Sequence, residues 1–392
     1  MSQVKWNGER LAYLDFIRGF AVLGLLFMNI PHMGLFELGY VRFEPAIVSD
    51  TVLDGIKAVL LDGRFRSLFC LLFGIGLYLQ SLSYRKRDLD HASILKTRML
   101  WLLLFGLIHC VFIWPGDILI MYALCGLFLI SRLNWSSDRL LQRGKLFFVI
   151  GLVLMFLEAM LYWYTEDIIT RDSATFSQAY DALLGPYRER LVIQAFVALV
   201  YILTFPILSL FYLGGVMLIG LGLFKSGKLS DGFTKQEVTG LAIVTALVSG
   251  VHLAMAIVSP ALNHYLAMLF GSVSGLTMAL LIWHWIVTSR LFTSTQAWST
   301  ALKRVGGMAL SFYIFQSVIA TLLLQVFYPE WILTFTQLDY FVMALVCIAL
   351  QLVLGFVYKG IFKQGPLEYM WRKLVERKVN AIVRQNGAST AG

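Results

Sequence analysis

Charged residues are scarce in this chain: Asp, Glu, Lys and Arg make up 14% of its 392 residues, whereas 59% are hydrophobic. A soluble domain carries roughly a quarter of its residues as charges, so this composition excludes that class. Prolines are also few, eight in all. Uncharged apolar runs of about 20 residues recur along the chain, and a helix of that length crosses the hydrocarbon core of a bilayer. We therefore expect an all-α, polytopic integral membrane protein.

Cysteines are equally scarce, and none of the four belongs to a CxxC pair. All of them lie in apolar runs: Cys70, Cys110, Cys125 and Cys347. Spacing of this kind is not that of a metal site, and a lone cysteine in an apolar run usually packs as a small hydrophobe. We predict no metal site.

The apolar runs predict ten membrane spans and one transmembrane bundle. The predicted spans are 11–32, 66–83, 99–115, 117–133, 146–164, 202–224, 238–258, 264–288, 305–327 and 340–359. The uncharged stretch from Leu191 to Phe224 is too long for one perpendicular span and short for two. We interpret 191–205 as an interfacial or re-entrant piece that leads into a single span, with a kink at Pro206.

The chain has a net charge of +9, and the distribution of its Lys and Arg residues between the loops sets the orientation. With ten spans, 24 of the 32 Lys and Arg residues fall on the side of both termini, seven fall on the other side, and Arg18 lies within a span. Cytoplasmic loops are enriched in Lys and Arg, so both termini are predicted to be cytoplasmic. This bias explains the positive charge without nucleic acid, and we expect no nucleic-acid partner.

Two ionisable residues inside the apolar runs are candidate functional residues, because such groups are energetically costly at membrane depth and are usually functional. His109 lies within one predicted span, and Asp117 follows it by eight residues across a tight turn at Trp114, Pro115 and Gly116. A carboxylate that accepts from one imidazole nitrogen leaves the other nitrogen free to act as a base. An interhelical hydrogen-bonding role for His109 remains the alternative.

The first span carries a second polar set, in which Asp15 and Arg18 are three residues apart and share one helical face. Arg18 is a candidate for binding an anion from the cytoplasmic side, because guanidinium binds phosphate bidentately; a self-neutralising pair is the alternative. Asn29, eleven residues further on, and Gln316 in the ninth span are candidate oxyanion donors or helix-packing groups.

Other charged residues have candidate roles at the outer side. Arg64 and Arg66, at the outer mouth of the second span, are candidates to hold an anionic acceptor or lipid headgroup, with an interfacial anchor as the alternative. Glu158 lies deep in the fifth predicted span instead, where it is a proton-relay candidate for a transporter or, as the alternative, a hydrogen-bonded structural residue.

Several segments together resemble the YeiB-like family, whose members carry domain of unknown function 418. The segments are LDFIRGFAVLGLLFMNI, FRSLFCLLFGIGL, GLIHCVFIWPGDILIMYALCGL, RVGGMALSFYIFQSVI and GPLEYMWRKL. The resemblance divides the bundle into an N-terminal part over 1–225, with the LDxxRG and GxxHxxxxxxGDIL motifs, and a C-terminal part over 226–380. Residues 381–392 are predicted to be a disordered tail.

The first helix of that family is similar to that of a larger superfamily of transmembrane acyltransferases. The resemblance implies transfer of an acyl group from cytoplasmic acyl-CoA to an outer acceptor. The polysaccharide acyltransferases of that superfamily place a histidine where this chain has Asn29. Either His109 has taken over as the base, or this branch does something else.

The sequence thus supports three hypotheses. The first is an acyltransferase of the bacterial inner membrane, in which Arg18 and Asp15 serve the acyl-CoA co-substrate and His109 and Asp117 activate a periplasmic glycan, lipid or small-molecule acceptor. The second is a transporter or flippase for an anionic or amphiphilic solute. The third is a non-catalytic membrane partner protein. Membrane lipids are expected partners in each case, and a homo-oligomer is left open.

Overall fold

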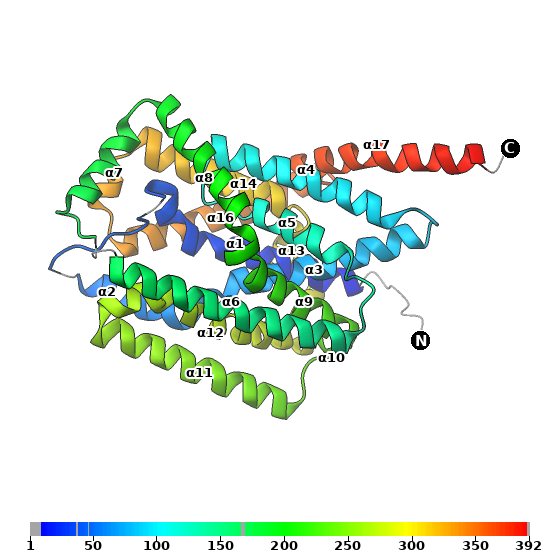
Figure 1. Ribbon diagram of the computed structural model, residues 1–392, viewed down its shortest axis with the longest axis horizontal. Coiled ribbons are helices and arrows are strands. Elements are labelled where there is room, and N and C mark those ends of the chain that lie inside the picture. The colour runs from blue at the N-terminus through cyan, green and yellow to red at the C-terminus, as the bar shows by residue number, and fades with distance from the viewer. Residues whose placement is uncertain (1–8, 37, 46, 166–168, 390–392) are drawn as a thin grey trace.

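The computed structural model is an all-helical bundle, described here for residues 9–36, 38–45, 47–165 and 169–389 (Figure 1). The first half contains α1 (Glu9–Gly34), α2 (Val48–Ile56), the π-helix η1 (Lys57–Leu61), α3 (Arg64–Arg85), α4 (His91–Phe112), α5 (Leu119–Ile130), α6 (Ser137–Thr165), α7 (Ala174–Leu184), α8 (Tyr187–Leu208) and α9 (Leu210–Lys225). The second half contains α10 (Lys228–Asp231), α11 (Lys235–Val258), α12 (Pro260–Ser289), η2 (Leu291–Thr293), α13 (Ala297–Gly306), α14 (Ala309–Leu322), η3 (Leu323–Phe327), α15 (Trp331–Thr334), α16 (Gln337–Ile361) and α17 (Pro366–Ser389).

Each of the ten predicted spans coincides with a helix or a bent helix pair. Eight helical segments of the described chain are long and apolar enough to cross a membrane, and the pair α8 and α9, bent by 65°, makes a ninth. The tenth, α5, has only 12 residues. The chain is therefore a multi-pass membrane protein. The predicted piece at 191–205 is part of α8, and the break comes at Ser209, three residues after Pro206.

Several helices extend further than predicted, α4 and α6 among them. α4 begins at His91, where the Asp90 side chain caps its first turn, and α6 begins at Ser137. The predicted disordered tail is the largest difference, because α17 continues to Ser389. Val375, Val379 and Ile382 of α17 bury against the beginning of α4, so this apolar stripe holds α17 as far as the beginning of the predicted tail. Residues 390–392 of that tail lie outside the described part of the chain.

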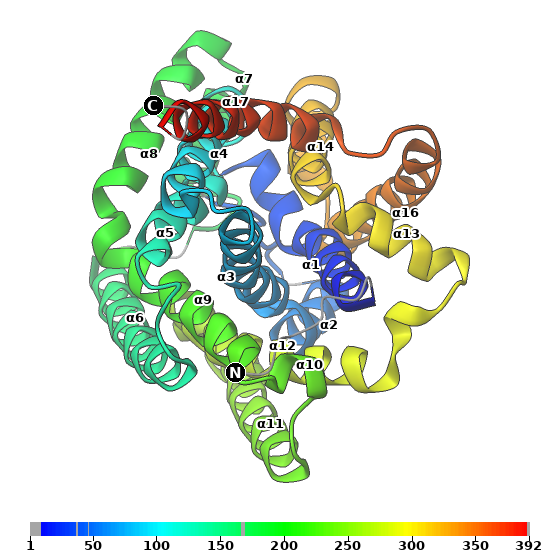
Figure 2. The same cartoon turned by 90° about the vertical axis from the view of Figure 1, so that its right-hand side faces the viewer.

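The bundle has two ends, which orient the rest of the description. The beginning of α1 and the end of α17 lie at one end, called the inner end here, and α2 and α7 lie at the opposite, outer end (Figure 1). The side of the membrane on which the termini lie remains a prediction. Viewed from the inner end, α3 occupies the centre (Figure 2), where it contacts α1, α4, α5, α9 and α12.

The outer end is closed by short segments tied together through Arg171. Its guanidinium donates to the carbonyl oxygens of Val41, Leu333 and Phe335 at 2.7–3.0 Å, and it lies 3.7 Å from the centroid of the Phe43 ring. These contacts join three segments distant in the sequence. Nearby, burial and a hydrogen bond to Asp50 raise the pKa of the Tyr40 hydroxyl, which therefore stays protonated and donates to that carboxylate.

The Arg171→Ala variant is expected to loosen this outer closure. Hydrogen bonds from a charged donor contribute about 1.5–3 kcal/mol each, so we expect the melting temperature in detergent to fall by several degrees. Arg188→Ala removes an exposed positive charge from the same end and is the control expected to melt like the wild type. Equal melting temperatures for the two variants would contradict the role given to Arg171.

Candidate functional site

The site is built around His109 and Asp117, which the turn between α4 and α5 brings together. His109 Nδ1 lies 2.8 Å from Asp117 Oδ1, and both side chains are fully buried. Gly106 permits this approach, since a Cβ there would lie 2.7 Å from the backbone nitrogen of Ile120 and 2.9 Å from Asp117 Oδ2. The eight-residue spacing therefore becomes a direct contact between base and carboxylate.

Hydrogen bonding orients both members of this His109–Asp117 pair. Asp117 Oδ2 accepts from the backbone nitrogen of Ile120 at 2.7 Å, which holds the carboxylate against the first turn of α5. A carboxylate oxygen accepts hydrogen bonds, so Nδ1 of His109 donates and Nε2 carries the lone pair. Nε2 is buried and has no hydrogen-bond partner in the described part of the chain. The imidazole is thus positioned to take a proton at Nε2.

Two aromatic residues, one from α14 and one from the turn after α4, pack around the pair. The Tyr313 ring of α14 lies 5.3 Å from the His109 ring, and the Trp114 ring lies 6.2 Å from it. The Tyr313 hydroxyl accepts from the backbone nitrogen of Ile118, and Trp114 Nε1 donates to the His32 carbonyl of α1 at 2.8 Å. Sequence reasoning missed Tyr313 and the role of Trp114, because both contacts depend on packing.

The other α1 residues lie along the same helix, towards the inner end. Arg18 Nη1 lies 2.6 Å from Asp15 Oδ1, and the two side chains are 29% and 39% exposed. Arg98 of α4 and Glu368 of α17 lie within electrostatic range of each other, and Arg18 is near the same guanidinium. Two guanidinium groups therefore approach each other at the inner end, where an anion can reach the partly exposed Arg18.

Asn29 and Gln316 differ in whether their side-chain amides are already hydrogen-bonded. Eleven residues make about three helical turns, so Asn29 lies on the same face of α1 as Arg18, and no hydrogen bond to its side chain occurs among the described residues. Gln316 Nε2, in contrast, donates to the Val22 carbonyl and to Gln351 Oε1. Both amide hydrogens are used, so Gln316 ties α1, α14 and α16 together, and we withdraw it as an oxyanion donor.

Arg64 and Arg66 do not form the predicted anion-holding pair. Arg64 is fully buried, and it donates to the carbonyl oxygens of Asp62, Ala58 and Val59 and to Ser249 Oγ. It caps the last turn of η1, and we withdraw it as a ligand-binding residue. Arg66 points elsewhere, and Nη2 donates to Ser272 Oγ of α12 at 3.2 Å.

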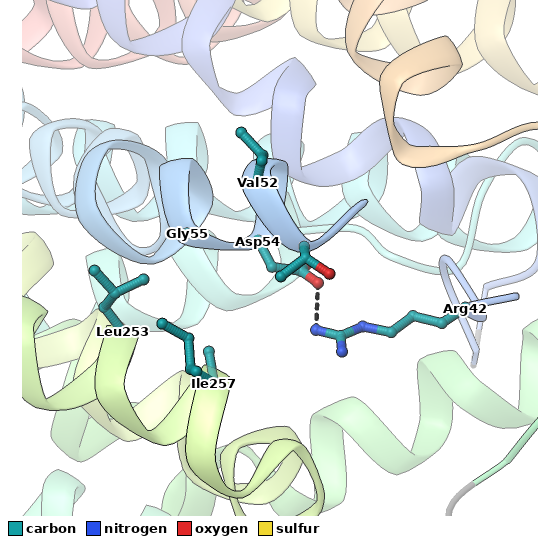
Figure 3. Close-up of a pocket in the computed structure, with 8 residues that line it drawn as sticks. Arg42, Val52, Asp54, Gly55, Leu253 and Ile257 are labelled. Atoms are coloured by element: carbon teal, nitrogen blue, oxygen red, sulfur yellow. Dashed lines mark hydrogen bonds and ion pairs between the residues drawn. The ribbon is translucent and has the colours of Figure 1, made fainter. Parts of the chain in front are cut away.

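The outer end also holds a cavity that the sequence did not indicate (Figure 3). It has a volume of about 230 Å³ and is lined by Arg42, Thr51, Val52, Asp54, Gly55, Leu253, Ala256 and Ile257. Arg42 forms an ion pair with Asp54 at its edge. The cavity lies between α2 and α11, whereas the His109–Asp117 pair lies on α4 and the following turn, so we treat the two as separate.

The remaining candidates fall outside this site. Glu158 lies on α6 and forms no ion pair among the described residues. No group of three or more His, Cys, Asp or Glu side chains within the described residues could hold a metal ion. The four cysteines are buried, as their apolar surroundings predicted.

Comparison with known proteins gives a family but no activity. Residues 223–378 match the family model of DUF418, a protein family of unknown function. The chain is 29% identical to the uncharacterized protein YeiB of Escherichia coli (strain K12), over 96% of this chain and 98% of that protein. It is 25% identical to the uncharacterized protein YxaH of Bacillus subtilis (strain 168), over 93% and 94% of the two chains. It is also 27% identical, over 96% and 97%, to an uncharacterized 39.9 kDa protein from the amylase 3' region of Bacillus acidopullulyticus.

No solved structure matches the chain significantly. The similarity to YeiB over nearly the whole length and the DUF418 match in the C-terminal part agree with the motifs in α1, α3, α4 and α14. The DUF418 match and the similarity to YeiB together support a YeiB-like DUF418 family for this chain.

Proposed function

We propose that this protein is an acyltransferase of the bacterial inner membrane, which moves an acyl group from cytoplasmic acyl-CoA to a hydroxyl or amine at the outer side. The observation that carries the proposal is the His109–Asp117 pair, in which the carboxylate orients a buried imidazole whose Nε2 has no partner. A base held in this way suits acyl transfer, because an acceptor hydroxyl is a poor nucleophile until it loses its proton.

Each residue of the site has a separate role in the proposed reaction. Arg18, partly exposed at the inner end, binds the phosphates of the donor, and Asp15 holds its side chain in place. Nε2 of His109 takes the proton of the acceptor as its oxygen or nitrogen attacks the thioester carbonyl carbon. The carbon–sulfur bond then breaks, and the thiolate of CoA receives that proton. The free amide of Asn29 supplies a hydrogen bond to the developing oxyanion.

The α1 helix sets the distance between the proposed phosphate-binding residue and the proposed oxyanion donor. Eleven residues of α-helix separate Arg18 from Asn29, about 16 Å at 1.5 Å per residue. Asn29 lies three residues before His32 in α1. The His32 carbonyl accepts a hydrogen bond from Trp114, and the Trp114 ring lies beside the His109 ring. A donor whose phosphates bind Arg18 must therefore extend its thioester into the bundle, while the acceptor approaches from the outer end.

Binding of the donor is tested with the purified protein in detergent. Acetyl-CoA and CoA are expected to raise the melting temperature of the wild type, and Arg18→Ala is expected to abolish that increase. Arg377→Ala removes an exposed charge from α17 and is the matched control that keeps the response. An unchanged response in Arg18→Ala would move the donor site away from α1.

A transporter for an anionic or amphiphilic solute is the second candidate, favoured by the bent pair α8 and α9. Broken helices often build the substrate sites of transporters. This function predicts counterflow of solute in liposomes without an acyl donor. Failure of several acyl-CoAs to stabilise well-folded wild-type protein would favour it over acyl transfer.

A further inference from the structure

The guanidinium of Arg66 lies inside the bundle with few partners. Nη2 donates to Ser272 Oγ at 3.2 Å, and the guanidinium carbon lies 5.0 Å from the centroid of the Tyr212 ring. Nε is buried without a hydrogen-bond partner, and the Tyr212 side chain is the other hydrogen-bonding neighbour of the guanidinium. Arginine has five N–H donors, so most of its capacity is unused.

No carboxylate of the described chain forms an ion pair with Arg66, and no backbone carbonyl of the described chain accepts a hydrogen bond from it. Arg18 pairs with Asp15 and Arg42 with Asp54, and Arg64 donates to three carbonyl oxygens. The polar side chains around Arg66 include Tyr212, Cys70 and Tyr122, none of which is a carboxylate. Cys70 Sγ and the Tyr122 hydroxyl are already paired at 3.1 Å.

Arg66 is partly buried, with Nε fully buried, and a positive charge with so few partners inside the bundle is costly. Buried charges in proteins are paired or hydrogen-bonded, because the effective penalty of an unpaired ion is several kcal/mol. A cation–π contact with one tyrosine recovers only about 1–2 kcal/mol of this. The described side chains therefore leave the charge of Arg66 largely uncompensated.

The surroundings of Arg66 suit a negatively charged group. The Tyr212 hydroxyl donates to no described group, so its proton is available to an acceptor. Tyr212 lies in the first turn of α9, immediately after the bend at Ser209, and a helix N-terminus carries partial positive charge. A guanidinium, a hydroxyl donor and the beginning of a helix thus converge on one place, three residues into α3.

We propose that Arg66 and Tyr212 form a second ligand site, which binds an oxyanion, either the carboxylate or phosphate headgroup of an amphiphile or a free anion of the same chemistry. Guanidinium binds such oxyanions bidentately through parallel N–H donors. The site lies on α3 and α9, apart from the His109–Asp117 pair, and it does not depend on acyl transfer.

The first experiment measures binding by thermal shift in a neutral detergent, with dodecyl phosphate and inorganic phosphate as probes. At least one probe is expected to stabilise the wild type. Arg66→Gln is expected to weaken its binding at least tenfold, and Arg66→Lys, which keeps the charge, to weaken it less. Arg42→Gln removes a charge from the same end and is expected to respond like the wild type. A response to dodecyl phosphate alone identifies an amphiphile, whereas a response to both probes identifies a free-anion site.

The second measurement separates a ligand site from a structural arginine. An uncompensated buried charge costs several kcal/mol, so Arg66→Gln, which removes it, is expected without added anion to melt at or above the wild-type temperature. Arg64→Gln, which strips four acceptors of their donor, is expected to melt well below it. The proposal is overturned if Arg66→Gln is destabilised or misfolded like Arg64→Gln, if it keeps the full response, or if neither probe stabilises the wild type.

Discussion

The His109→Ala variant is expected to lose acyl transfer almost completely. A positioned general base contributes about 10²- to 10⁴-fold to rate, and Nε2 of His109 is the atom to which we assign that role. Asp117→Asn is also expected to reduce the rate strongly, because an amide no longer dictates which imidazole nitrogen carries the proton. The measurement is acyl transfer by purified protein in proteoliposomes that contain acetyl-CoA on the inner side.

Stability must be measured beside activity, because His109 and Asp117 are both fully buried. Removing the imidazole leaves a carboxylate oxygen unpaired, at a cost of about 1–3 kcal/mol. His109→Gln keeps a donor for Asp117 but cannot take up a proton, so it is expected to fold and remain inactive. His252→Ala removes a different buried histidine, on α11, and is expected to keep transfer. Full activity in His109→Gln would refute the assignment.

The Gly306→Ala variant is expected to cause the largest loss of stability. α1 and α13 meet here, and an added Cβ would lie 1.8 Å from the Asp15 carbonyl oxygen and 2.7 Å from the Gly19 backbone nitrogen. Backbone atoms cannot rotate away, so the two helices must separate. Overpacking costs about 1–3 kcal/mol even where side chains can adjust, and we expect about 3 kcal/mol or more here.

A matched glycine makes this prediction specific. A Cβ on Gly76, in the middle of α3, would meet no atom within 4 Å, so Gly76→Ala is expected to be neutral or to add up to about 1 kcal/mol through helix propensity. The measurements are the melting temperature and the yield of monodisperse protein. Since Arg18 Nη1 lies 3.4 Å from the Gly306 carbonyl, the Gly306 variant should also weaken acetyl-CoA binding. Equal melting temperatures for the two variants would show that the contact between α1 and α13 is not tight.

Much of this molecule follows from local sequence. Apolar runs long enough to cross a bilayer located a helix at each of the ten predicted spans, because a backbone in lipid must satisfy its hydrogen bonds within its own segment. The His109–Asp117 contact was also within reach of the sequence. Only a short turn separates α4 from α5, and this turn keeps the two residues close together.

The roles of the other polar residues were decided by tertiary structure. Arg64 and Arg66 are two residues apart, yet one is saturated by the carbonyl oxygens of η1 and the other faces Tyr212 and Ser272. Gln316 joins two helices by a hydrogen bond because Val22, 294 residues away in the sequence, lies beside it. Sequence determines which polar groups enter the membrane, since that depends on composition along each helix. Whether such a group is satisfied or free depends on neighbours brought by other helices, and only the packed bundle supplies them.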